Sequence, residues 1–260
     1  MDLEAILERL NEEMAINSRV FSINAFGFDI PISETMISMT IVTIIIIVLA
    51  LVLVKAKKFT PIPGKRQTII EVIVDFVNNF TKGQVGHYWK SFAPYFGTVL
   101  FFLLISNIIS IFNIIPTKTF FYDMLKIEAF KDFPIYQLKP PTKDINVPAT
   151  LALMSITLLL FSTIFLRGIK GFLKTFIEPS PIMLPFKILD YFVRPLTLTL
   201  RLFGNIFAAY VIMELLIIAV PIFIPAFASL YFDLFDGILQ AYIFIFLTSV
   251  YLHENLETAH

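Results

Sequence analysis

The sequence contains no cysteine and is poor in charged residues. Without cysteine the chain has no disulfide bond, no thiolate nucleophile and no thiolate metal ligand. Its histidines, His87, His253 and His260, form no HxxxH pair, so no metal site is indicated. Charged residues make up 15% of the chain, against about 25% in soluble globular proteins. The 20 basic and 20 acidic residues balance, so nothing in the net charge favours nucleic acid as a partner.

Apolar residues, in contrast, make up 57% of the chain, and the mean hydropathy is +0.82. This composition favours an integral membrane protein over a soluble enzyme. A helix needs about 20 apolar residues to cross a bilayer, and three stretches meet this condition after a polar N-terminal leader over 1–34. We therefore predict membrane helices over 35–54, 91–117 and 145–167.

The region 181–252 is also apolar, but it carries ionisable residues inside its pattern. Pro221 and Pro225 interrupt it, and because proline disfavours helix interiors, we expect two helices that form a long hairpin. The predicted fold is thus an all-α integral membrane protein with five membrane helices. Within the loop over 55–90, apolar residues recur at helical spacing over 68–82, which predicts an amphipathic helix on the membrane surface.

The distribution of lysine and arginine predicts the orientation of the chain. These residues are concentrated in the loop over 55–90 and again in the loop over 168–180. Loops rich in lysine and arginine remain in the cytoplasm. We therefore predict an N-terminus outside the cell, an outer loop over 118–144 and a cytoplasmic C-terminus, although the outer loop also contains lysines.

Arg201 lies within the first helix of the predicted hairpin. An arginine at the centre of a membrane helix costs about 2.5–3.5 kcal/mol on insertion scales, so it requires a polar partner or a water-filled cavity. One helical stripe carries it together with polar and small residues: Asp190, Arg194, Thr197, Arg201, Asn205, Ala208 and Ile212. Gly204 and Ala208 lie four apart near the same edge, a spacing that lets another helix approach closely.

The last predicted helix has a second polar face, formed by Asp233, Asp236, Gly237, Gln240, Phe244 and Thr248. Antiparallel packing would set Gln240 opposite Arg201, and we expect its amide oxygen to hold the guanidinium. Two interpretations of Arg201 remain open: an ion pair with Asp190, Asp233 or Glu214 that locks the bundle, or a role on an ion path. For Asp233 and Asp236, the alternatives to ion conduction are snorkelling to the outer interface and lining a vestibule.

Other polar positions have simpler structural interpretations. Asn107, inside the predicted helix 91–117, is typical of a helix–helix hydrogen bond. Asp144 and Asn146 stand where a cap of the helix 145–167 is expected, because their side chains accept hydrogen bonds at helix starts. Glu214 lies on the far side of its helix from Arg201, so it is not expected to pair with it. The chain lacks GxxxxGK[ST], GxGxxG and HExxH, so we predict no nucleotide site, no cofactor and no catalytic centre.

Two segments resemble subunit a of the membrane sector of F-type ATP synthases, in its bacterial form. The segment over 194–208, RPLTLTLRLFGNIFA, resembles the signature of that family, and the segment over 232–244, FDLFDGILQAYIF, resembles its last helix. The motifs LISN at 104–107 and DIN at 144–146 match further polar positions. The resemblance runs from about residue 61 to about residue 251.

The resemblance implies a non-catalytic stator subunit in the bacterial plasma membrane. Such a subunit lies in lipid against a rotating ring of c subunits, beside the b-subunit stalk and beneath the F1 sector. Two offset aqueous half-channels bring ions to a carboxylate on each c subunit and release them on the other side. The coupling ion, H⁺ or Na⁺, stays open. The alternative from another class is a self-contained transporter that uses Arg201 to bind an anion.

Roles for individual residues follow from the same resemblance. Arg201 matches the essential arginine that separates the half-channels, and Asn205 and Gln240 match the residues that flank or position it. Asp233 matches a position of the inlet half-channel, with Asn107 and Asp144 along the same path. Tyr210 stands where some members have a carboxylate, so the further candidates for the inlet acid are Asp236 and Glu214. From helical phase alone, Asp190 is our candidate for the outlet.

Overall fold

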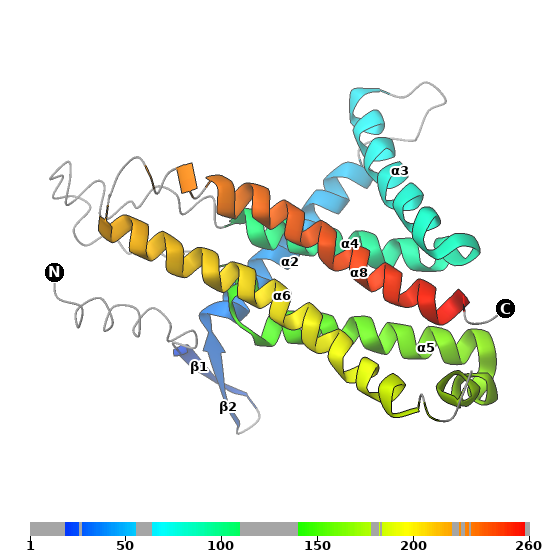
Figure 1. Ribbon diagram of the computed structural model, residues 1–260. Helices are drawn as coiled ribbons and strands as arrows, with labels where there is room; N and C mark the ends of the chain where they lie inside the picture. Colours follow the sequence, from blue (N-terminus) through cyan, green and yellow to red (C-terminus); the bar gives the residue numbers. More distant parts are fainter. Residues whose placement is uncertain are drawn as a thin grey trace, which may run out of the picture.

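The computed structural model describes residues 19–25, 28–55, 64–109, 140–177, 182, 184–219, 224, 227–228 and 230–257. Most of the predicted outer loop, the first part of the leader and the predicted proline turn therefore lie outside the described residues. Long helices dominate the remainder, and a small antiparallel hairpin precedes the first of them (Figure 1).

The hairpin consists of β1 (Arg19–Ala25) and β2 (Phe28–Ser33). Its register pairs Phe21 with Ile32 and Ile23 with Ile30. The predicted polar leader contains no indication of this sheet beyond its alternating apolar residues. Strand β2 leads directly into α2 (Glu34–Lys55), whose first turn is capped by the hydroxyl of Ser33, which accepts a hydrogen bond from the Met36 amide at 3.3 Å.

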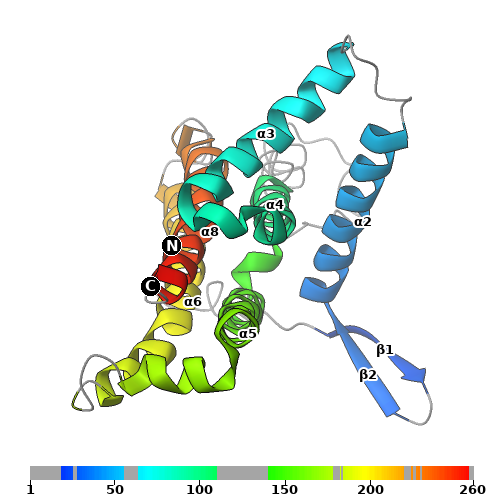
Figure 2. The same cartoon turned by 90° about the vertical axis from the view of Figure 1, so that its right-hand side faces the viewer.

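Helix α2 makes few contacts with the rest of the chain and lies to one side of the bundle (Figure 2). Apolar side chains cover its circumference, and most of them are exposed, whereas Val42 and Ser38 are buried. A helix that is apolar all round and little buried by its own chain suits contact with lipid. This composition matches the predicted membrane helix over 35–54.

Helix α3 (Lys65–Val85) covers the predicted amphipathic segment, and Gly86 ends it with a φ of 65° that favours glycine. A short 3₁₀ turn, η1 (Gly86–Tyr88), connects it to α4 (Trp89–Ile108). The face of α3 that is buried carries Val77, Thr81 and Val85. The apolar stripe that predicted the helix, which includes Val72 and Phe76, is largely exposed instead and is free to contact lipid.

Helix α5 (Asn146–Ile177) follows a 3₁₀ turn, η5 (Pro141–Lys143), and is longer than the predicted helix over 145–167. The predicted end nevertheless coincides with a bend in α5. At Gly168, just after that end, a φ of 69° and a ψ of 170° interrupt the helix. The bend after Gly168 turns the last part of α5 away from its first part (Figure 2).

Helix α6 (Leu184–Ala219) and helix α8 (Gly237–Glu257) form the predicted long hairpin and run antiparallel beside each other (Figure 1). A π-helix, η7 (Leu230–Asp236), precedes α8. Helix α5 packs along α6, and α4 packs along α8. The apolar core lies where these helices meet and includes Phe96, Leu103, Leu198, Leu202, Ala241 and Phe244.

Five helical segments of the described chain are long and apolar enough to cross a membrane: Glu34–Val52, Gln67–Ile108, Asn146–Leu166, Leu184–Met213 and Leu230–Leu256. The second contains both α3 and α4. The prediction of an all-α membrane protein with five membrane helices is thereby confirmed for this part of the chain. The β1–β2 hairpin is an addition outside the helical bundle.

Candidate functional site

Arg201 lies on α6 and points away from the core of the chain. Its neighbours Leu198 and Leu202 are 1% and 0% exposed, whereas Arg201 is exposed. Within the part of the chain that the structure describes, Arg201 has no hydrogen bond and no ion pair. The guanidinium therefore faces outward from the described part of the chain.

The alternative in which an acid of the same chain locks Arg201 finds no support in these contacts. Asp190 is exposed and forms no ion pair with Arg201. The backbone positions of Glu214 and Asp233 lie in α6 and η7, but their side chains are outside the described part of the structure.

Asn205 and Gln240 join α6 to α8 beside Arg201. The Asn205 side-chain amide donates a hydrogen bond of 2.8 Å to the Gln240 Oε1 atom, and Gln240 is 1% exposed. The expectation that this oxygen holds the guanidinium of Arg201 is therefore wrong. Asn205 lies one helical turn beyond Arg201, level with Gln240 across the contact between the helices, whereas Arg201 faces outward. The two amides join the helix pair, and no described hydrogen bond connects either of them to Arg201.

Asn107 connects three elements at the other side of α8. Its Nδ2 donates to the Gly237 carbonyl at 3.0 Å, and its Oδ1 accepts from the Thr142 hydroxyl at 2.9 Å. Asn107 is 5% exposed and Thr142 is fully buried. The helix–helix hydrogen bond expected from sequence is thus present, and it fixes the residue at which η7 gives way to α8.

Asp144 and Asn146 form the predicted cap of α5. The Asp144 Oδ1 accepts from the backbone amide of Asn146 at 3.0 Å and from its side-chain amide at 2.9 Å. An acceptor at this position satisfies a free amide of the first helical turn. The capping interpretation of these residues is confirmed, and Asp144 is also 6% exposed and therefore almost wholly buried.

Asp233 and Asp236 both belong to the π-helix η7 rather than to a regular α-helix. A π-helix forms hydrogen bonds over five residues and so occurs mainly as single-turn insertions, frequently at functional sites. Its wider turn changes the direction of these two positions relative to Gln240, so the single α-helical face predicted over 233–248 is wrong for its first part. The side chain of Asp236 is half-buried.

Sequence reasoning found no partner for Arg194, which the structure ties to α8. Its Nη2 contacts the Glu254 Oε2 at 2.8 Å, and its guanidinium lies 4.9 Å from the centre of the Tyr251 ring. One turn earlier, the Tyr191 hydroxyl donates to the Asn255 Oδ1 at 2.9 Å. The spacing of Tyr251, Glu254 and Asn255 on one helix face was the signal that could have predicted this contact.

The fold and these contacts define a polytopic membrane protein with an exposed arginine on a membrane helix, and this arginine has no ion pair among the residues that the structure describes. Comparison with known proteins gives the family. The model of the family described as "ATP synthase A chain" matches residues 36–253. The protein named "ATP synthase subunit a, sodium ion specific" from Propionigenium modestum is 35% identical over 237 residues, which cover 90% of this chain and 77% of that protein.

The chain belongs to the ATP synthase A chain family. Members of this family are non-catalytic ion-channel subunits of the membrane sector of the ATP synthase, so the resemblance noted from the sequence is confirmed. The chain functions in ion translocation as part of that complex, and synthesis of ATP is a property of the complex.

Proposed function

We propose that Arg201 is the fixed charge that separates two ion half-channels in the face of this subunit toward the c-ring. The observation that carries the proposal is its outward position on α6 without a carboxylate partner in the described chain. An unpaired cation in a membrane is costly, so it is retained where a group from another chain compensates it. The carboxylate of a passing c subunit is such a group.

The chemistry of the site follows from this charge. A guanidinium beside a carboxylate favours the ionised form, so each arriving c subunit gives up its ion next to Arg201. The same positive charge repels a free cation and blocks direct leakage between the half-channels. Each unit charge that crosses the membrane supplies about 2.3 kcal/mol per 100 mV, and this energy favours rotation in one direction.

The surface around Arg201 suits a closely approaching partner. A Cβ atom added at Gly204 would meet nothing within 4 Å, so no part of the described chain occupies the space beside it. Leu196 and Leu200 on the same helix are 56% and 53% exposed. Small residues with an apolar surround are typical of helix contacts within membranes. We assign this face to the c-ring and the remaining apolar surface to lipid and the b-subunit stalk.

The half-channels are assigned from the positions of the acids. Asp233 and Asp236 in η7 form the inlet, near the Asn107 and Asp144 contacts that hold the start of α8 and of α5. Glu214, near the end of α6, is the third acid of this region. Asp190, exposed near the start of α6, belongs to the outlet. We place the N-terminus outside the cell and the C-terminus in the cytoplasm of a bacterium.

The coupling ion is the finer question, because the relative from Propionigenium modestum is named as sodium ion specific. The surroundings of the ring carboxylate largely decide between H⁺ and Na⁺. Synthesis assays with the assembled complex in liposomes, under a sodium gradient or a proton gradient alone, would identify the ion.

The test of the central proposal is Arg201→Ala in the assembled complex. We expect the complex to retain its c-ring while ion-driven ATP synthesis falls to background, since no charge is left to release the ion. Phe192→Ala is the matched control, because it removes a side chain that is 73% exposed on the same helix and that lies about half a turn around the helix from Arg201. Normal synthesis by Arg201→Ala would contradict the proposal. A loss of the c-ring in that variant would instead indicate an assembly role.

A further inference from the structure

A buried lysine lies at the end of the bundle to which we assign the inlet. The side chain of Lys143, the last residue of η5, is 3% exposed. Among the residues whose burial the structure describes, no other lysine is buried. Lysine is almost never fully buried unless it is paired, because the removal of a charge from water is costly. The charge of Lys143 therefore belongs to the interior of the chain rather than to its surface.

Two hydrogen bonds connect the turn that contains Lys143 to the end of η7. The hydroxyl of Thr142, the residue before Lys143, donates to the Asn107 Oδ1 at 2.9 Å, and the Asn107 Nδ2 donates to the Gly237 carbonyl at 3.0 Å. Gly237 directly follows Asp236. Lys143 and Asp236 thus flank the two ends of one buried contact.

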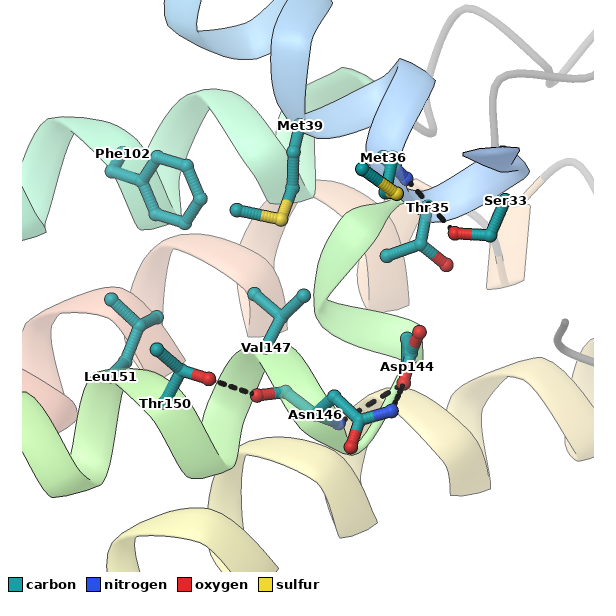
Figure 3. A pocket seen from close by; sticks show the side chains of 10 residues that line it. All are labelled: Ser33, Thr35, Met36, Met39, Phe102, Asp144, Asn146, Val147, Thr150 and Leu151. Carbon is teal, nitrogen blue, oxygen red and sulfur yellow. Dashed lines mark hydrogen bonds between the residues drawn. The ribbon is translucent and has the colours of Figure 1, made fainter. Parts of the chain in front are cut away.

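A cavity lies beside the residue that follows Lys143. Asp144, whose carboxylate caps α5, also lines a cavity of about 310 Å³ between α2, α4 and α5 (Figure 3). Ser33 and Thr35 line the same cavity. A cavity of this size with polar groups in its wall can hold several water molecules. Lys143 therefore adjoins a space that water can occupy.

The charges around Lys143 are mostly negative. Helices α2, α4, α5 and α6 all contact η5. The acids at this end of the bundle lie on four different segments: Glu34 in the first turn of α2, Asp144 before α5, Glu214 in the last part of α6 and Asp236 at the end of η7. In the described chain, the other basic residue at this end is Arg19, which pairs with Ser33 in the β1–β2 hairpin. Neighbouring carboxylates favour the ammonium form of Lys143.

We propose that Lys143 is a positioning residue of the inlet, whose fixed positive charge sets the concentration of the coupling cation at which the inlet is half-saturated. The inference rests on the proposed inlet along Asp144 and Asp236. A unit charge about 10 Å away, at an effective dielectric constant of about 20, changes the binding of a cation roughly tenfold. Lys143 thus weakens the binding of an entering H⁺ or Na⁺ to the inlet acids. Conduction requires such weak binding, because the ion must also leave.

The test uses the assembled complex in liposomes, with ATP synthesis driven by a constant potassium diffusion potential. The concentration of the coupling ion on the inlet side is varied, so that the half-saturating concentration is obtained separately from the maximal rate. We expect Lys143→Met to lower the half-saturating concentration about tenfold. Lys143→Arg retains the charge and should leave this concentration within about twofold of the native value.

A purely structural role of Lys143 would give a different result. It would lower the maximal rate of both variants and leave the half-saturating concentration unchanged. Replacement of a buried charge by an apolar residue of similar volume is often neutral or stabilising, so we expect Lys143→Met to assemble. If it does not, Lys143→Gln takes its place, with the same expected shift.

Two further variants separate this inference from the proposed inlet. Lys90→Met is the matched control, because Lys90 is exposed at the opposite end of α4, and it should leave the half-saturating concentration unchanged. Asp236→Asn tests the inlet itself and should raise that concentration about tenfold, since a negative charge is lost. A shift in Lys143→Met without one in Asp236→Asn would contradict the inlet assignment of Asp236 and support the role of Lys143.

An unchanged half-saturating concentration in Lys143→Met would overturn the inference, whatever the result for Asp236→Asn. Equal shifts in Lys143→Met and Lys143→Arg would overturn it as well, because the shape of the side chain rather than its charge would then be the cause.

Discussion

Two glycines show how differently the two faces of the α6–α8 hairpin are built. A Cβ atom at Gly237 would lie 2.9 Å from the Cβ of Asn107, whereas a Cβ atom at Gly204 would meet nothing within 4 Å. The start of α8 is thus closed against α4, and the middle of α6 is open. The two arginines of α6 differ in the same way, since Arg194 binds Glu254 and Arg201 has no partner in the described chain. The described interactions within the chain are concentrated on one face, and the other is the face that we assign to the c-ring in our proposal.

The largest effect expected from this difference concerns the two arginines. Arg201→Ala should abolish ion-driven ATP synthesis and leave the free energy of unfolding of the purified chain unchanged, because Arg201 has no hydrogen bond or ion pair among the described residues. Arg194→Ala should retain measurable synthesis but lower that free energy by about 1–3 kcal/mol, because it removes the charge-assisted hydrogen bond to Glu254 and the contact with the Tyr251 ring. Detergent titration and synthesis assays measure the two quantities. Equal destabilisation by both variants would remove the distinction between the faces.

The two glycines provide the next test. Gly237→Ala should destabilise the chain by about 1–3 kcal/mol, as overpacking does in a filled interior. Gly204→Ala should stabilise the isolated chain by up to about 1 kcal/mol, because alanine is the better helix former. The prediction for the complex is the reverse for Gly204→Ala: copurification of the c-ring should decrease, since the added methyl group would keep the ring at a distance. An unchanged ring content in that variant would mean that the open face meets lipid.

A smaller effect is expected where the two faces join. The bond between Asn205 and Gln240 should give a coupling energy of about 0.6 kcal/mol, and not more than about 1.7 kcal/mol, in a double-mutant cycle. The variants are Asn205→Ala, Gln240→Ala and their combination, and detergent titration of the purified chain measures the unfolding. Additive effects of the single variants would show that the bond does not hold the helices together.

The smallest effect is expected for Glu254→Gln. The side chain of Glu254 is 52% exposed and that of Arg194 is 17% exposed, so solvent screens the charge, and an amide oxygen can still accept the hydrogen bond. The loss of stability should be below about 1 kcal/mol and should shrink further at high salt. A larger loss of stability that is independent of salt would indicate that Arg194 and Glu254 form a buried ion pair. This ion pair would then contribute as much stability as the interior contacts.

The sequence predicted the helices of the bundle well because each is a property of one segment. The charge-free stretch before Lys55 predicted α2 within a few residues, and the apolar repeat over 68–82 predicted α3. The bend at Gly168 and the π-helix before Gly237 were not predicted, because regular spacing cannot reveal where a helix departs from its period. The β1–β2 hairpin was also missed, since short alternating patterns are weak within a polar leader.

The candidate site was predicted by residue but not by contact. Arg201, Asn205 and Gln240 were all singled out from their spacing, and the structure brings the last two together. The predicted partner of Gln240, Arg201, was wrong, and Asn205 takes that place. Helical phase gives the direction of a side chain but not its position along the axis of the neighbouring helix. The contacts of Arg194 with Tyr251 and Glu254 were missed for the same reason, because these partners lie 57 and 60 residues further along the chain.

The sequence by itself determined the membrane location of this protein, its helical bundle and the presence of an arginine that a lipid environment makes costly. These features depend on the composition and the apolar periodicity of single segments, and both can be determined directly from the sequence. Only the tertiary structure decided that Arg194 binds Glu254, that Arg201 has no hydrogen bond or ion pair among the described residues, and that Asn107 closes the start of α8. Such contacts depend on how far each helix is rotated and shifted against its neighbours, and the combined fit of all the side chains sets these displacements.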